Sequence, residues 1–246
     1  MKAVCSIWVL FMCLSCLGSD PPDTIASHPG FNEYQVEREA LVREIENYHG
    51  ISVHDQKVLY ALRRVPRHLF VPSELIPYAY LNNPLPIGYN QTISQPVIVA
   101  SMTQMLDAKA GEKILEIGTG SGYQAAVLAE LDCEVYTIEI VPELGERSQK
   151  LLSELGYKNV HVRIGDGYEG WKEHAPYDKI IVTCAPEKVP NALIEQLTAK
   201  GRIVIPVGGI NEIQYLLILR YNKKGKLIRE YKYPVRFVPM TGKAKE

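Results

Sequence analysis

The chain has 246 residues, and its hydrophobic share of 46% is ordinary for a globular protein with a substantial core. That length suits one large domain, or one domain with an added N-terminal piece. Its 27 basic and 28 acidic residues give a formal net charge of −1, and no basic block indicates binding to extended nucleic acid. The nearest basic cluster, Arg63, Arg64 and Arg67, is explained by a solvated helix end.

The first residues have the composition of a secretory leader. Lys2 precedes an apolar run from Ala3 to Leu14, and small residues follow up to Ser19. This run has the length of a signal-peptide core and is too short for a stable membrane span. We therefore expect a signal-like leader over residues 1–18, with Cys16-Leu17-Gly18 as a plausible cleavage site. A bacterial lipoprotein box, a mis-assigned start and a merely apolar N-terminus remain alternatives.

Proline and glycine divide the next part of the chain. Residues 19–32 contain three prolines and a glycine and are expected to be a flexible linker, so that the domain spans residues 33–246. Apolar spacing predicts helices over Glu33–Tyr48 and Asp55–Arg64, which form an N-terminal helical extension of the domain. Prolines recur from Pro66 to Pro96, where we expect mostly loop.

From Val97 onward, helical and strand patterns alternate. A helix over Val97–Leu106 is followed by apolar runs typical of parallel strands, separated by helices centred near Leu128, Leu151 and Leu193. Two antiparallel strands, Gln214–Arg220 and Leu227–Val238, end the pattern. This order predicts an α/β fold with a doubly wound, mostly parallel, Rossmann-like sheet and a ligand at its carboxyl edge. The expected parallel strands are Lys113–Ile117, Glu134–Ile138, Val160–Ile164, Lys179–Thr183 and Arg202–Val207.

A glycine loop follows the first of these strands, in the run Ile114-Leu-Glu-Ile-Gly-Thr-Gly-Ser-Gly122. Alternate glycines let the backbone turn sharply and approach a ligand, and the following helix leaves unpaired N–H groups at its start. The pattern lacks the third glycine of the dinucleotide fingerprint, and Glu116 suits a cationic ligand better than a diphosphate. Glu139 closes the next strand, where a carboxylate could accept hydrogen bonds from both ribose hydroxyls.

Other strand ends add one more candidate ligand. Gly165-Asp166-Gly167 permits a tight turn and leaves the Asp166 carboxylate free to accept a hydrogen bond from an exocyclic amine such as adenine N6. The alternative is a plain Asp-Gly turn without a ligand. The cysteines and histidines show no metal-ligand spacing, so no metal site is expected. Cys133 and Cys184 should lie at opposite ends of the sheet, too far apart for a disulfide.

The glycine loop and its distal acid resemble the nucleoside-binding half of class I S-adenosylmethionine-dependent methyltransferases. Further segments look like protein-L-isoaspartate O-methyltransferase, and the resemblance extends from about Val36 to Gly242 in the right order. The leader alone departs from the family pattern. The segments that carry the resemblance are Val65–Pro72, Gln91–Pro96, Ile164–Gly167, Thr183–Pro186, Gly201–Gly208 and Pro234–Pro239.

This resemblance implies methyl transfer from S-adenosylmethionine to the α-carboxylate of isoaspartyl residues in damaged proteins, whose methyl esters then cyclise to succinimides. It assigns Ser94 to catalysis, with helix N-capping as the structural alternative. Phe237 and Val238 are expected to help form the peptide groove. The donor would be held by Thr92, Ile93, Glu116, Gly118, Gly120, Gly122, Glu139, Asp166 and Gly167.

Several alternatives remain open from the sequence. The acceptor could be a small-molecule carboxylate, or the protein could bind S-adenosylmethionine without turnover. An NAD-dependent dehydrogenase is a weaker alternative because of the glycine pattern. A glycine-rich turn in another α/β protein is also weaker, because the loop, its flanking elements and the distal acid all agree with nucleoside binding. We expect a monomer that acts on isoaspartyl proteins and peptides and binds no nucleic acid. The expected location is the cytoplasm, with export to the periplasm or cell envelope through the leader as the alternative.

Overall fold

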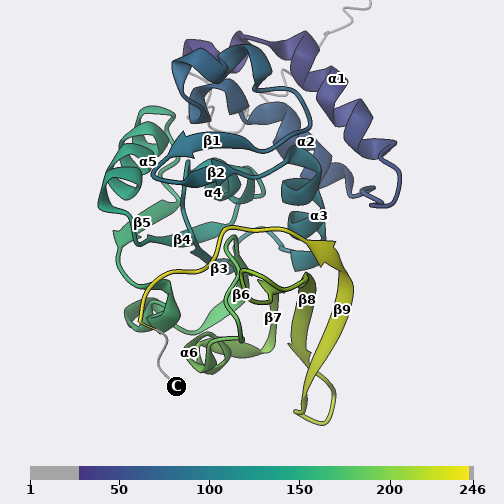
Figure 1. The fold of residues 1–246 in the computed structure, drawn as a ribbon, viewed down its shortest axis with the longest axis vertical. Coiled ribbons are helices and arrows are strands. Elements are labelled where there is room, and N and C mark those ends of the chain that lie inside the picture. The colour runs from purple at the N-terminus through teal and green to yellow at the C-terminus, as the bar shows by residue number, and fades with distance from the viewer. Residues whose placement is uncertain (1–27, 244–246) are drawn as a thin grey trace, which may run out of the picture.

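A seven-stranded sheet forms the centre of the computed structural model, which describes residues 28–243 (Figure 1). The strand order is β5-β4-β3-β6-β7-β8-β9; β5 to β7 pair in parallel, and β8 and β9 pair antiparallel. This confirms the predicted mostly parallel α/β sheet with antiparallel C-terminal strands. The strands are β3 Lys113–Ile117, β4 Glu134–Glu139, β5 Val160–Ile164, β6 Tyr177–Val182, β7 Leu197–Val207, β8 Gln214–Tyr221 and β9 Leu227–Val235.

Helices cover both faces of this sheet, as a doubly wound fold requires. Side chains alternate between the faces along each strand, so that Ile114 joins the larger core and the adjacent Leu115 joins the smaller one. The larger core packs against α1 to α5, whereas the smaller core packs against α6. These helices are α1 Gln35–Glu46, α2 Gln56–Arg64, α3 Pro96–Leu106, α4 Tyr123–Ala129, α5 Pro142–Glu154 and α6 Asn191–Glu195.

The predicted linker is in part a packed segment. Residues 28–32 are described, and Pro29–Asn32 form a 3-10 helix whose Phe31 is buried in the larger core. Residues 29–32 therefore pack with the helices of the larger core, because the buried aromatic side chain of Phe31 anchors this segment. The leader over residues 1–18 and the rest of the linker lie outside the described residues.

The region expected to be mostly loop, residues 66–96, contains regular structure. Short 3-10 helices cover Arg67–Phe70 and Ser73–Tyr78, and a hairpin follows with β1 Leu85–Gly88 and β2 Gln91–Ile93. The hairpin turns at Tyr89 and Asn90, whose φ angles are 53° and 57°. The sequence prediction missed it because Tyr-Asn is a weak signal for a turn in which two residues adopt positive φ. In the view of Figure 1 this hairpin is drawn between α5 and α2, and Arg147 of α5 donates to the Ile87 carbonyl of β1 at 2.9 Å.

The last predicted strand is too long. β9 ends at Val235, and the following residues leave the sheet and cross back along the segment after β6 (Figure 1). There the Ala185 N–H donates to the Val238 carbonyl at 2.9 Å, and the Met240 N–H donates to the Ala185 carbonyl at 2.8 Å. These bonds place residues 238–241 against the carboxyl edge of the parallel strands.

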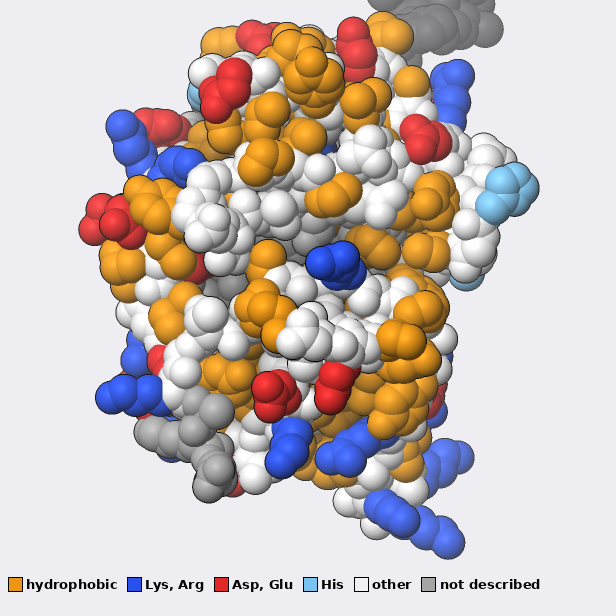
Figure 2. Space-filling model, in the orientation of Figure 1, with side chains coloured by type: hydrophobic (Ala, Val, Ile, Leu, Met, Phe, Trp, Pro, Cys, Tyr) orange, Lys and Arg blue, Asp and Glu red, His pale blue; other side chains and the backbone are white. Residues whose placement is uncertain are grey.

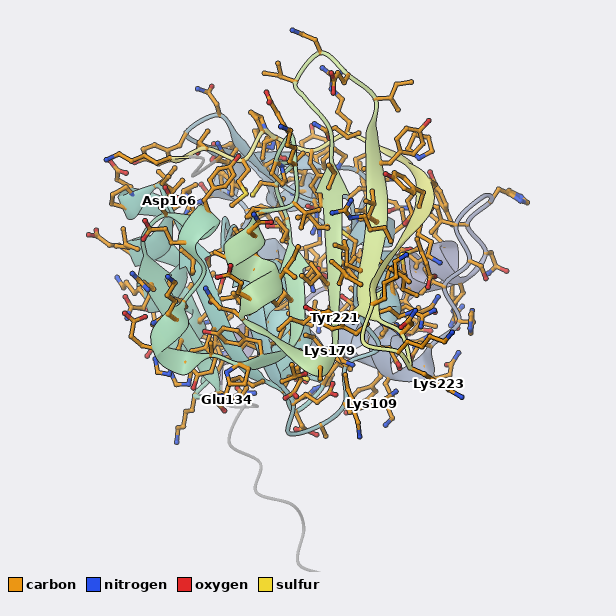
Figure 3. All side chains as sticks on the ribbon, turned by 90° about the horizontal axis from the view of Figure 1, so that it is seen from below. Lys109, Glu134, Asp166, Lys179, Tyr221 and Lys223 are labelled. Carbon is orange, nitrogen blue, oxygen red and sulfur yellow. The ribbon has the colours of Figure 1, made fainter. Side chains whose placement is uncertain are left out.

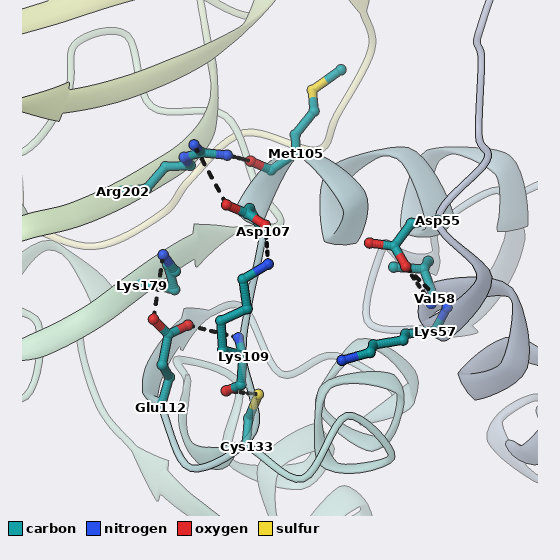
Figure 4. A network of polar contacts seen from close by, with 10 residues as sticks. All are labelled: Asp55, Lys57, Val58, Met105, Asp107, Lys109, Glu112, Cys133, Lys179 and Arg202. Atoms are coloured by element: carbon teal, nitrogen blue, oxygen red, sulfur yellow. Dashed lines mark hydrogen bonds and ion pairs between the residues drawn. The ribbon is translucent and has the colours of Figure 1, made fainter.

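A polar network closes the opposite edge of the sheet (Figure 4). Arg202 donates to the Met105 carbonyl at 2.6 Å and lies 3.9 Å from Asp107, while Lys179 pairs with Glu112 at 3.5 Å. Figure 3 shows Lys179 and Glu134 at this edge and Asp166 at the other. The network therefore fixes the C-terminal end of α3 to the sheet at a distance from the carboxyl edge.

Residues 28–243 lack two features that would indicate other functions. None of the helices in this range combines the length and apolar composition needed to cross a membrane. Within the same range, no group of three or more His, Cys, Asp or Glu side chains could hold a metal ion. Cys133 and Cys184 are both free thiols.

Candidate active site

A cleft of about 760 Å³ opens at the carboxyl edge of β3, β4 and β6, which is where an open α/β sheet binds its ligand. The glycine loop and the ends of these strands form its floor, and the end of β2 and residues 238–241 form its other walls. Of the residues predicted for the site, those that line this cleft are Thr92, Ile93, Ser94, Gly118, Gly120, Glu139, Gly167 and Val238.

The glycine loop needs a residue without a side chain at its first position. Gly118 has a φ of +95°, and a Cβ atom there would lie 2.5 Å from the Thr183 Oγ1 atom. That hydroxyl donates to the Gly118 carbonyl at 2.7 Å and to the Ile117 carbonyl at 3.0 Å. The end of β6 therefore supports the loop from below, and the loop backbone faces the cleft directly.

Glu139, at the end of β4, is tied directly to this loop. Its Oε2 atom accepts a hydrogen bond from the Gly120 N–H at 2.7 Å, and its Oε1 atom accepts one from the Val141 N–H at 3.0 Å. The side chain is only 5% exposed and lines the cleft. Two backbone bonds thus orient a carboxylate toward the position where hydroxyl donors of a ligand would lie.

Ser94 lies between β2 and α3, on the opposite wall of the cleft from the strand ends. Within the described residues no hydrogen bond engages its hydroxyl, while its carbonyl accepts from the Arg67 Nη2 atom at 2.9 Å. The N-cap position of α3 belongs to Gln95, and the Val97 N–H is capped by the Asn82 Oδ1 atom at 3.0 Å. The capping alternative for Ser94 is therefore wrong, and its hydroxyl is available to a ligand.

Two of the predicted donor residues lie in the strand and loop but outside the cleft lining. Glu116, within β3, is fully buried, and no hydrogen bond reaches either of its carboxyl oxygens. Gly122 is the N-cap residue of α4, where its φ of +87° completes the turn into the helix. Glu116 therefore lies in the core beneath the glycine loop, and Gly122 forms the turn between the loop and α4.

Two further predicted residues are engaged by backbone groups. The Asp166 carboxylate accepts from the Tyr168 N–H at 2.9 Å and from the Lys243 N–H at 2.7 Å, so it is not free as the sequence predicted. The Phe237 N–H and carbonyl both bond to the side-chain amide of Gln214, at 2.6 and 3.1 Å. Its side chain packs against the larger core, away from the cleft, and the adjacent Val238 lines the cleft instead.

Sequence reasoning missed the remaining cleft residues. Some could have been found, because Thr183 and Cys184 follow β6 and Ile140 follows Glu139 at the same sheet edge. The wall formed by the returning C-terminal segment had no local signal. The missed residues are Gln91, Val99, Ile117, Thr119, Ser121, Tyr123, Gln124, Ile138, Ile140, Thr183, Cys184, Pro239, Met240 and Thr241.

The cleft contains one acid and no base among its lining residues. The acid is Glu139. Burial raises the pKa of the Cys184 thiol to about 12, with smaller contributions from Glu139 and Glu116. Burial likewise raises the pKa of Tyr123 to about 12. Both groups stay neutral near pH 7. On the face shown in Figure 2, charges of both signs are interspersed with apolar side chains, and basic side chains gather at its lower end.

Glu116 gives the fold a testable pH dependence. Burial raises its pKa from 4.5 to about 8, and the neighbouring Thr137 hydroxyl, which already pairs with Thr119, offsets this only in part. Between about pH 5 and pH 8 the native protein keeps a proton that the unfolded chain has released. The free energy of unfolding should therefore fall by up to about 1.4 kcal/mol per pH unit as pH rises.

The Glu116→Gln variant should lack this slope, because glutamine does not titrate. Urea unfolding of both proteins across this pH range measures the effect. As pH falls from about 8 to 5, the free energy of unfolding of the wild type should rise relative to that of the variant. Parallel pH profiles of the two proteins would show that the buried carboxyl is not protonated in the native state.

Comparison with known proteins decides the family. The sequence profile of the family described as protein-L-isoaspartate(D-aspartate) O-methyltransferase matches residues 36–245. The chain belongs to this family. The match confirms the resemblance predicted from about Val36 to Gly242.

Similar proteins of this family cover most of the chain. It is 53% identical over 203 residues to protein-L-isoaspartate O-methyltransferase 2 of Polaromonas sp., covering 82% of this chain and 96% of that one. It is 54% identical over 210 residues to the protein-L-isoaspartate O-methyltransferase of Dictyoglomus turgidum, covering 85% of this chain and 93% of that one.

Solved structures agree with the fold. One protein-L-isoaspartate O-methyltransferase superposes with a TM-score of 0.75 at 29% identity, covering 84% of this chain and 67% of that one. A Plasmodium falciparum protein described as a putative member of the same family, solved with S-adenosyl-L-homocysteine, gives a TM-score of 0.72 at 22% identity. That alignment covers 83% of this chain and 98% of the Plasmodium chain, and it bears on the fold alone.

Proposed function

We propose that this chain transfers a methyl group from S-adenosylmethionine to the α-carboxylate of L-isoaspartyl residues in damaged proteins and peptides. The resulting ester would cyclise to a succinimide without further enzymatic help, which begins repair. The observation that carries this proposal is that an oriented carboxylate, Glu139, and an unengaged hydroxyl, Ser94, line one cleft in a member of this family.

The residues of the cleft fit the proposed donor. Glu139 presents a carboxylate to the two ribose hydroxyls, and the backbone of Gly118 and Gly120 comes close to the ligand without side chains. Gly167, Thr92 and Ile93 would enclose the rest of the nucleoside. Asp166 does not line the cleft, and its proposed contact with an adenine amine would use the remaining lone pairs of a carboxylate that already accepts from two backbone N–H groups. Bound S-adenosylmethionine supplies an electrophilic methyl group on a sulfonium.

The acceptor side needs alignment more than proton transfer. A carboxylate is already ionised near neutral pH, so no general base is required, and no basic side chain lines the cleft. The Ser94 hydroxyl donates to one acceptor oxygen and directs the other toward the methyl group. Since no lysine or arginine in the lining neutralises the acceptor, its oxygen keeps its nucleophilic charge. Proximity and orientation then supply most of the acceleration.

Cys184 is the competing nucleophile in this cleft. A thiolate attacks alkyl donors more readily than a carboxylate does, and the thiolate is the reactive form of cysteine. Burial and the two nearby glutamates raise the pKa of this thiol to about 12, so it stays protonated. Burial of the Cys184 thiol therefore protects the enzyme from methylation of its own sulfur.

The decisive experiment offers labelled S-adenosylmethionine with a peptide that contains isoaspartate and with its ordinary aspartate twin. We expect a base-labile methyl ester on the isoaspartyl peptide and none on the twin. Transfer only to small-molecule carboxylates would favour a metabolite methyltransferase. Donor binding without any ester would indicate a non-catalytic binding protein.

We further propose that the catalytic domain acts as a monomer in the cytoplasm, where S-adenosylmethionine is made. The two free body cysteines support a reducing location. N-terminal sequencing of the natural mature protein tests this, because a start at Met1 removes the export alternative. Light scattering of the purified protein tests the monomer.

A further inference from the structure

Arg67 is fully buried, although the sequence predicts that it is exposed. The sequence places it in a basic cluster at a solvated helix end, but its side chain has no exposed surface. It begins the 3-10 helix Arg67–Phe70, just after α2. A fully buried guanidinium is costly unless its donors are used. Within the described residues the Arg67 Nε and Nη2 atoms have carbonyl partners while Nη1 has none, so the paired donors point to its role.

Those contacts join the two ends of the segment that carries the β1–β2 hairpin. The Arg67 Nε atom donates to the Ala79 carbonyl at 2.9 Å, and Nη2 donates to the Asn83 carbonyl at 3.4 Å, both ahead of β1. Nη2 also donates to the Ser94 carbonyl at 2.9 Å, directly after β2. One side chain thus fixes the backbone on both sides of the hairpin, including the residue proposed to bind the acceptor.

The same guanidinium also contacts the donor side of the cleft. Its Cζ atom lies 4.8 Å from the centre of the Tyr123 ring, within the range of a cation–π interaction. Tyr123 is the first residue of α4, directly after the glycine loop, and it lines the cleft. Arg67 is therefore in contact with Ser94 on one wall and with the helix that follows the glycine loop on the other.

We propose that Arg67 is a positioning residue for methyl transfer, which sets the distance between the Ser94 hydroxyl and the glycine loop. This inference rests on the proposed function, since it concerns the alignment of acceptor with donor. Arg67 touches neither ligand and acts through the Ser94 backbone.

Lysine cannot replace this side chain. The three carbonyl contacts and the ring contact use the planar, forked shape of a guanidinium, whereas an ammonium is a compact charge on a flexible stem. Burial lowers the pKa of Arg67 only to about 10, so the group is still cationic near neutral pH. In the Arg67→Lys variant the Ser94 segment should lose its fixed distance from α4.

The test compares Arg67→Lys with Arg38→Lys. Arg38 is a matched control because it is also a buried arginine that donates to backbone carbonyls, among them those of Glu33, Arg63 and Arg64. None of these partners lines the cleft. For each variant kcat, the KM of both substrates and the Kd for S-adenosylhomocysteine are measured below the melting temperature. We expect Arg67→Lys to lower kcat about tenfold with donor Kd changed less than about twofold. Arg38→Lys should lower the melting temperature only.

A double-mutant cycle with Ser94→Ala shows whether Arg67 acts through Ser94. In the Ser94→Ala background, Arg67→Lys should change kcat by less than about twofold. An equal loss in both backgrounds, or an unchanged kcat in the Ser94-containing protein, would overturn the proposal. If Arg67→Lys and Arg67→Gln both fail to fold while Arg38→Lys folds, Arg67 serves stability instead. Wild-type protein that methylates no isoaspartyl peptide would refute the proposed function, which is a separate result.

Discussion

Replacing Ser94 with alanine is expected to lower kcat for an isoaspartyl peptide by about tenfold to a hundredfold, with the donor Kd nearly unchanged. The substitution removes one hydrogen bond to a charged acceptor, which is worth roughly 1.5–3 kcal/mol. It leaves the Ser94 carbonyl and its bond to Arg67 in place, so the loop should keep its course. Steady-state kinetics with labelled donor, together with calorimetric titration of S-adenosylhomocysteine, measure both quantities.

Ser73→Ala is the matched control for this prediction. Ser73 is an exposed serine of the same N-terminal region, and its hydroxyl contacts the adjacent Glu74. Its replacement should leave kcat unaltered. Equal turnover by the Ser94→Ala and wild-type proteins would remove the serine hydroxyl from the mechanism, while the donor site would stand.

Glu139→Gln is expected to weaken donor binding by about a hundredfold or more. In the wild type the carboxylate accepts from the Gly120 and Val141 N–H groups and has lone pairs left for two ribose hydroxyls. A glutamine amide offers one acceptor oxygen and turns an NH₂ group toward donors. Two weakened hydrogen bonds to a charged group correspond to roughly 3–6 kcal/mol. The Kd for S-adenosylhomocysteine, measured by calorimetry, tests this.

Glu134→Gln supplies the control on the same strand. Glu134 begins β4, at the opposite edge of the sheet from Asp166 (Figure 3), and there it pairs with His161. Its replacement should leave the donor Kd within about twofold of wild type, since its pair is half exposed and such pairs contribute little. If the Glu139→Gln variant and the wild type had the same donor Kd, the ribose would be bound by residues other than Glu139.

The parallel part of the sheet could be predicted from the sequence because its signals are local. β3 and β5 begin and end where the apolar runs do, and the glycine loop directly follows β3. Glu139 was predictable for the same reason: the carboxyl ends of adjacent parallel strands meet at one edge. Ser94 came instead from the resemblance of Gln91–Pro96 to a known family. In the structure the Asn82 side chain, not Ser94, accepts the hydrogen bond from the Val97 N–H in the first turn of α3, so the Ser94 hydroxyl is not used as a cap.

The errors have a common cause, which is contact between residues far apart in the sequence. The sequence predicts Arg67 at the surface, but it is buried because it donates to the carbonyls of Ala79 and Ser94, which lie 12 and 27 residues further along the chain. Asp166 looks free until the backbone of Lys243 reaches it. The sequence predicts that Phe237 and Val238 both form the peptide groove. In the structure the Gln214 side chain fixes the backbone at Phe237, whose ring packs against the core, and only Val238 lines the cleft.

The wall formed by residues 238–241 has a consequence for biosynthesis. The glycine loop, Glu139 and Ser94 leave the ribosome well before this segment, which is held by its bonds to Ala185. A nascent chain extended only as far as β9 has a cleft open on one side to water. The cleft is therefore complete only after residues 238–241 have left the ribosome and bonded to Ala185.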